Sequence, residues 1–132
     1  MIVLDASAAI TILLNTGPSA EAIRLRVGHP DQSLHVPHLF EVEVLHALRR
    51  LNLSGCASSE RALIALTRLR AMILIRYPHT AFLPRIWELR ENVTAYDASY
   101  IALAETLNSP LVTTDAKLAR ASGIRAEVEL YE

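Results

Sequence analysis

The distribution of apolar and polar positions along the chain predicts alternating strands and helices. Short apolar runs that end at turn-forming or charged residues are typical of buried strands, whereas apolar residues recurring every three or four positions indicate helices. Strands are predicted at residues 1–4, 34–36, 73–76, 110–114 and 126–130. Helices are predicted at residues 6–15, 19–28, 38–51, 59–72, 80–92, 94–108 and 115–122. This alternation favours an α/β domain of three layers, with a central and mostly parallel sheet flanked by helices.

Length and composition describe one globular unit. The chain has 132 residues, of which 52% are hydrophobic and 20% are charged, and no linker or repeat divides it. We therefore expect a single domain over 1–132 with its own core. The mean hydropathy is positive, which predicts a partner surface or a homodimer.

Cysteine usage and the absence of long apolar runs indicate a compartment. Cys56 is the only cysteine, so no intramolecular disulfide can form, which suits a reducing environment. No run approaches the length of a membrane span, and the N-terminus lacks the pattern of a signal peptide. We expect a cytoplasmic protein with no membrane partner.

Net charge does not by itself point to nucleic acid. The formal charge is −1, whereas a dedicated nucleic-acid clamp is usually basic. The cations are almost all arginine, and Lys117 is the only lysine. Arginine suits bidentate phosphate binding, but biased codon usage produces the same composition.

Two acids stand directly after predicted strands. Asp5 ends "IVLD" and Asp115 ends "LVTTD", and ligands of parallel sheets bind outside the carboxyl ends of the strands. The two carboxylates are therefore expected to converge. For each acid alone, capping of the following helix is the competing explanation.

A third acid lies inside a predicted helix. In "TAYDASYIALAE", Asp97 shares a face with Ile101 and Ala104, and Thr94 is the better N-cap. A buried carboxylate is costly unless a positive group meets it. That group is either a neighbouring arginine or a bound cation.

The helix after Pro37 carries two more candidates. Glu43 shares a face with Leu39 and Ala47, whereas Glu41 falls between leucines on another face. The helical wheel does not choose between them.

Several carboxylates at one place repel each other unless a cation compensates. Carboxylate ligands without thiolates or paired histidines favour Mg²⁺ or Mn²⁺ over zinc. The chain has no glycine-rich phosphate loop and no nucleophile elbow. Ser7 is better explained as a group at the helix start or near a metal than as a nucleophile.

Four motifs in order resemble the PIN-domain family, and more narrowly the VapC toxins of type II toxin–antitoxin modules. The motifs are "MIVLDASAAI", "VPHLFEVEVLHALRRL", "ENVTAYDASYIALAE" and "LVTTDAKLARA". The resemblance implies that the catalytic and metal-binding acids are Asp5, Glu43, Asp97 and Asp115. It selects Glu43 over Glu41, and it implies that Mg²⁺, or Mn²⁺ as a substitute, meets the charge of Asp97. We place Asp5 and Asp97 closest to the metal.

The resemblance also implies activity and partners. Members of this family are metal-dependent endoribonucleases that cut tRNA or rRNA, form homodimers and are inhibited by a cognate VapB-type antitoxin. One other function stays open: a non-catalytic PIN module that binds RNA or an antitoxin. A receiver-like phosphoacceptor domain fails on detail, because it would need adjacent acids early in the chain and a lysine after a late strand. Arg50, Arg90 and Lys117 are candidate RNA contacts. Trp87, Tyr96 and Tyr100 are expected to be packing residues.

Overall fold

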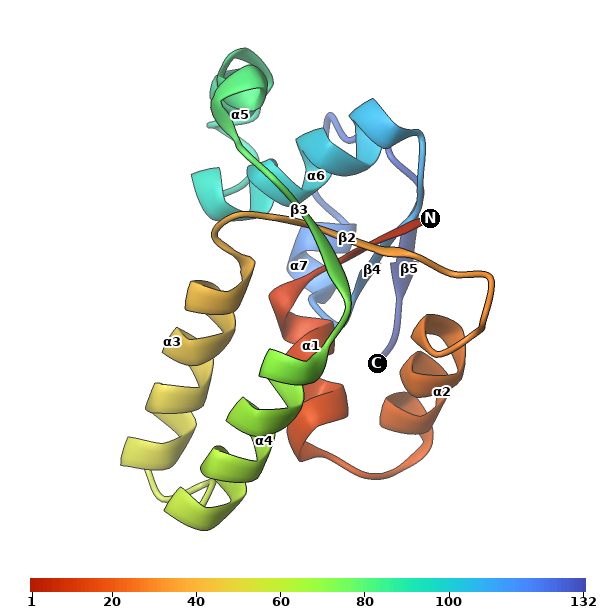
Figure 1. Cartoon of the computed structure of the whole chain (residues 1–132). Helices are drawn as coiled ribbons and strands as arrows, with labels where there is room; N and C mark the ends of the chain where they lie inside the picture. The colour runs from red at the N-terminus through yellow and green to blue at the C-terminus, as the bar shows by residue number, and fades with distance from the viewer.

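The computed structural model describes all residues, 1–132, and its centre is a five-stranded sheet (Figure 1). The strands are β1 (Ile2–Leu4), β2 (Leu34–Pro37), β3 (Leu74–Tyr77), β4 (Leu111–Thr113) and β5 (Val128–Leu130). Their order across the sheet is β3-β2-β1-β4-β5, and every neighbouring pair is parallel. Val3 in the central strand pairs with His35 on one side and with Leu111 on the other.

Helices cover both faces of the sheet. They are α1 (Ala6–Leu14), α2 (Pro18–Val27), α3 (Phe40–Leu53), α4 (Ser59–Ala71), the 3₁₀ turn η1 (Thr80–Phe82), α5 (Leu83–Glu88), α6 (Ala95–Leu107) and α7 (Ala116–Ala119). Helix α1 packs with α2, α3 and α4 on one side, and α6 packs on β1, β2 and β4 on the other (Figure 1). The predicted three-layer α/β fold with a parallel sheet is confirmed.

The central strands are apolar because both of their faces are covered. Residues 2–4 of β1 and 111–113 of β4 are fully buried, and all of them except Thr113 join a core cluster that includes six residues of α6. Parallel sheets covered on two sides have continuous apolar strands of this kind. The edge strand β3 is only partly buried, in keeping with its position.

Two predicted helices are shorter than expected. The segment 80–92 divides into η1, α5 and a turn, because Pro84 cannot continue a helix that starts at Thr80: its ring would clash with the Thr80 carbonyl. Helix α7 ends at Ala119, where Ala121 donates to the Leu118 carbonyl in a tight turn. Gly123 follows at φ 85°, a conformation that favours glycine.

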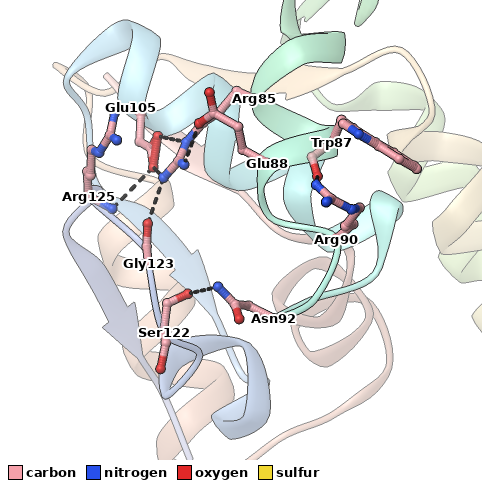
Figure 2. A network of polar contacts seen from close by, with 9 residues as sticks. All are labelled: Arg85, Trp87, Glu88, Arg90, Asn92, Glu105, Ser122, Gly123 and Arg125. Atoms are coloured by element: carbon pink, nitrogen blue, oxygen red, sulfur yellow. Dashed lines mark hydrogen bonds and ion pairs between the residues drawn. The ribbon is translucent and has the colours of Figure 1, made fainter.

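A polar network fixes α5 to the rest of the domain (Figure 2). The Arg85 guanidinium donates from Nε and Nη2 to the Glu105 carboxylate of α6, both at 2.9 Å. Arg85 Nη2 also donates to the Gly123 carbonyl at 2.6 Å, and the Arg125 backbone N–H donates to Glu105 at 3.1 Å. One ion pair therefore links α5, α6 and the segment after α7.

None of the helices combines the length and apolar character that crossing a bilayer requires. Cys56 is exposed in the loop between α3 and α4.

Candidate functional site

Four carboxylates line one cavity of about 360 Å³ at the carboxyl edge of the sheet. Asp5 follows β1, Asp115 follows β4, Glu43 comes from α3 and Asp97 from α6. Strand β2 pairs with β1 on one side, and the chain later crosses over so that β4 pairs with β1 on the other side. Such a reversal opens a crevice in open α/β sheets, and these acids stand in it.

Asp5 is the most buried of the four, with 4% of its surface exposed. The Ser7 hydroxyl donates to Asp5 Oδ2 at 2.5 Å, and the Thr113 hydroxyl donates to the same oxygen at 2.8 Å. Both of these side-chain donors use Oδ2, and none binds Asp5 Oδ1. Although Asp5 stands at the N-cap position of α1, its side chain does not cap the helix, so the capping explanation is wrong for this residue.

Thr113 is a part of the site that the sequence motifs did not single out. Its side chain is fully buried, and its hydroxyl oxygen accepts the Asp115 backbone N–H at 3.0 Å while donating to Asp5. Ser7 completes the connection by accepting the Thr114 backbone N–H at 3.1 Å. The signal in the sequence was a polar residue at the buried end of an apolar strand, where an unpaired hydroxyl is costly.

Asp115 both caps a helix and lines the cavity. Its Oδ1 accepts the backbone N–H groups of Lys117 at 2.9 Å and Leu118 at 3.2 Å. The capping explanation is therefore right for Asp115, and it does not remove the acid from the cavity.

Asp97 lies in the first turn of α6, where Thr94 is the N-cap as predicted and accepts the Asp97 backbone N–H at 3.2 Å. No arginine or lysine forms an ion pair with Asp97 or with the other three cavity acids. The arginine explanation for Asp97 is therefore wrong.

The structure separates the two glutamates of α3. Glu41 accepts hydrogen bonds from Arg76 of β3 at 2.7 and 2.9 Å and does not line the cavity. Glu43 is half-buried and does line it. The two side chains leave α3 in different directions, and only Glu43 reaches the other acids.

The electrostatics of the cavity favour a cation. Burial, with a smaller contribution from the negative charge of Asp5, raises the pKa of Glu43 to about 7 and the pKa of Asp97 to about 6. Burial also raises the pKa of Asp5, although the Ser7 and Thr113 hydroxyls act against the increase. These three carboxylates are costly to ionise without a positive partner.

The donor set fits Mg²⁺ or Mn²⁺. The cavity offers carboxylate and hydroxyl oxygens and no thiolate, which is the ligand chemistry of hard divalent ions. Nowhere in the chain do three or more acids, histidines or cysteines form a ready ligand cluster. Mg²⁺ does not need one, because it commonly binds through one or two carboxylates and keeps several waters.

Of the three aromatic residues predicted to be packing residues, Tyr100 is one, whereas Trp87 and Tyr96 are not. Tyr100 is fully buried, and its hydroxyl has no hydrogen-bond partner: it lies near Glu43 but outside hydrogen-bond geometry. Trp87 and Tyr96 are 68% and 64% exposed, so neither is a packing residue. They stand on the outer end of α5 and the first turn of α6, beyond the core.

The candidate RNA-contacting cations divide between two cavities. Arg50 lines the acid cavity together with His46. Arg90 and Lys117 line a neighbouring cavity. A larger cavity of about 810 Å³ lies at the amino ends of β2 and β3, but no carboxylate lines it, so we place the chemistry at the acids.

Comparison with known proteins gives one consistent answer. Residues 2–124 match the model of the PIN domain. The chain is 47% identical over 121 residues to the ribonuclease VapC9 of Mycobacterium tuberculosis, covering 89% of this chain and 88% of that protein. It is 46% identical over 132 residues to the ribonuclease VapC1 of the same organism, covering 97% and 96%. The crystal structure of PAE2754 from Pyrobaculum aerophilum superposes with a TM-score of 0.70 at 23% identity, covering 96% of this chain and 81% of that one.

Proposed function

Since the chain belongs to the PIN-domain family and, within it, to the VapC ribonucleases, we propose that it is the endoribonuclease toxin of a VapBC-type module. Its substrate would be cellular RNA, tRNA or rRNA in particular, and its reaction the hydrolysis of a phosphodiester bond. Its cofactor would be Mg²⁺, with Mn²⁺ as a substitute.

The observation that carries this proposal is the cavity of four unpaired carboxylates. Asp5, Glu43, Asp97 and Asp115 come from four distant parts of the chain and face one space. Burying like charges together has no benefit for stability. It is the arrangement expected of a site that receives a divalent cation and a phosphate.

Each acid has a role that its surroundings support. Ser7 and Thr113 hold one oxygen of Asp5, which leaves the other available for a ligand. Asp97 and Asp5 would bind the ion directly, with Glu43 and Asp115 acting in part through water. When bound, the divalent ion lowers the pKa of water and offsets negative charge at phosphorus. A cavity carboxylate would accept the proton of the attacking water.

A VapB-type antitoxin is the partner that the family predicts, and a homodimer is the predicted self-association. Apolar side chains of α3 and α4 are available for such contacts. Leu45, Leu53, Leu63 and Leu66 are exposed and border a shallow groove between the two helices.

The test compares two carboxylates of the same protein. Purified, antitoxin-free protein is incubated with total RNA and with isolated tRNA, in Mg²⁺, Mn²⁺ or EDTA. We expect discrete cleavage in Mg²⁺ or Mn²⁺, none in EDTA, and a loss of about 100-fold or more in Asp97→Asn.

Glu41→Gln is the matched control. It removes a carboxylate two residues from Glu43 on the same helix, but one that is paired with Arg76 outside the cavity. It should cleave at the wild-type rate. Full activity in Asp97→Asn, or equal activity in EDTA, would contradict the proposed mechanism.

A further inference from the structure

A second cavity, of about 350 Å³, adjoins the acid cavity. Asp97 lines both of them. The remaining walls of the second cavity are residues 90–94, which lead into α6, and Lys117 and Leu118 of α7. Asp97 is therefore the wall that the two cavities have in common.

Two cations without acidic partners line the second cavity. Arg90 and Lys117 form no ion pair, whereas Arg26, Arg76 and Arg85 are each bound to a glutamate. Lys117 lines this cavity together with Asp97. Glu91 also lines this cavity, but it forms no ion pair with either cation. Positive groups that no carboxylate neutralises by an ion pair are suited to a phosphate of the substrate backbone.

Trp87 provides an aromatic face next to one of these cations, Arg90. The Arg90 guanidinium carbon lies 4.7 Å from the Trp87 ring centroid, and Arg90 Nη1 donates to the Trp87 carbonyl at 3.0 Å. Figure 2 shows the indole and the guanidinium together, apart from the network around Arg85. Arg90 covers one face of the ring, and the exposed fraction of 68% shows that most of the ring remains open.

The segment that holds these groups is anchored on two sides. The Arg85–Glu105 pair fixes α5, and Asn92 Nδ2 donates to the Ser122 carbonyl at 2.8 Å (Figure 2). Trp87 and Arg90 stand between these anchors in the sequence. A site whose supports are already in place loses less freedom when a ligand binds.

We propose that the second cavity and Trp87 bind the nucleotide adjoining the scissile phosphate of single-stranded RNA, with its phosphate on Arg90 and Lys117 and its base stacked on Trp87. Base stacking on an exposed aromatic ring beside a cationic groove is a common way to hold single-stranded RNA. This inference rests on the proposed function, because it assigns part of the same substrate.

The chain supplies its own probe, because Trp87 is its only tryptophan. Full-length protein is titrated with a single-stranded RNA of mixed sequence and about 12 nucleotides, a length within the range that single-strand binding sites cover. Ca²⁺ replaces Mg²⁺ in the buffer. Tryptophan emission reports stacking, and anisotropy of a labelled copy of the RNA reports total binding. We expect saturable quenching with the same midpoint as the anisotropy curve.

Four variants complete the test. Trp87→Ala and the double variant Arg90→Ala/Lys117→Ala should each weaken RNA binding by about 10-fold. Trp87→Phe should restore most of the binding, because it keeps an aromatic face. Arg70→Ala removes an exposed, unpaired arginine of α4 outside both cavities, and its affinity should stay within about two-fold of wild type.

RNA binding without any change in tryptophan emission, or Trp87→Ala binding as tightly as wild type, would overturn this inference. If cleavage still required Asp97 in that case, the proposed function would stand and only the nucleotide site would fail. Absence of both binding and cleavage with every RNA would overturn the two proposals together.

Discussion

At the scale of single residues, the hydroxyl of Thr113 has hydrogen-bond partners at two of the cavity acids. It donates to Asp5 and accepts from the backbone of Asp115, so one buried atom fixes two of the four acids. We expect Thr113→Val, which keeps the shape and removes the hydroxyl, to reduce kcat by about 10- to 100-fold, as changes behind a metal ligand do. Single-turnover cleavage measures the effect.

Thr113→Ser is the matching control, because it keeps the hydroxyl and loses only a methyl group. It should recover most of the activity that Thr113→Val loses. If both variants lost the same activity, packing at this position would matter and the hydrogen bonds would not.

The sequence predicted which residue types gather here, but not all of their contacts. Asp5 and Asp115 followed from their places after strands. The choice between Glu41 and Glu43 did not follow from the helical wheel, because it depends on Arg76, which lies 35 positions away from Glu41. The assignment of Asp5, Glu43, Asp97 and Asp115 to catalysis remains a prediction.

At the scale of elements, the position of α5 depends on the pair between Arg85 and Glu105. Burial raises the pKa of Glu105, but hydrogen bonds from Arg85 and from the Arg125 backbone, with the charge of Arg85, bring it below 4.5. A lowered carboxylate pKa adds stability above the unfolded-state value, and that stability is lost as the pH falls through the folded-state value. Urea unfolding should therefore show that stability falls as the pH drops below the ordinary pKa of glutamate, about 4.3.

Glu105→Gln should flatten that fall, since it removes the titrating group. Glu88→Gln is the control on the same arginine: Glu88 is 60% exposed, and an exposed pair contributes little. An identical pH dependence in wild type and Glu105→Gln would show that this brace does not contribute to acid sensitivity.

Strands were easier to predict than helix ends. The strands β1 and β4 are buried on both sides, so their apolar runs are unambiguous. The predicted helix at 80–92 was too long because its apolar spacing continues past Pro84, and its true end depends on the contacts of Arg85 with α6. Packing between distant segments decides such boundaries.

At the scale of the whole molecule, the carboxylates of the acid cavity lower the folding stability of the metal-free protein, while the proposed function requires them. Ionised Glu43 lies near Asp5 and Asp97 without a positive partner. We expect Glu43→Gln to raise the unfolding free energy of the metal-free protein by roughly 1 kcal/mol at pH 8, while it reduces cleavage. Chemical denaturation in EDTA measures the difference.

Mg²⁺ should stabilise the wild type and have less effect on Glu43→Gln, because a ligand that binds the folded state shifts unfolding by mass action. Arg70→Ala, outside the cavity, should respond to Mg²⁺ as the wild type does. A Glu43→Gln protein less stable than wild type in EDTA would contradict the account of an uncompensated cavity.

The fold class followed from the alternation of strands and helices, which any parallel α/β domain shows. The strand order did not follow from it, because no local feature of the sequence indicates that β4 pairs with β1 on the side opposite β2. That return brings Asp115 beside Asp5. The exposed position of Trp87 could not be predicted either, since a large aromatic ring is usually mostly buried.

The central place of β1 has a consequence for the order of events during synthesis. Strand β1 is translated before the other four strands and is flanked by β2 and by β4. Its neighbour β4 is made more than 100 residues later, as the Thr113–Asp5 hydrogen bond illustrates with 108 positions between its partners. Domains fold as they emerge, but here the acids cannot meet until residues 111–115 have been made. Interrupted translation products that end before this point would lack Asp115 and therefore a complete acid cavity.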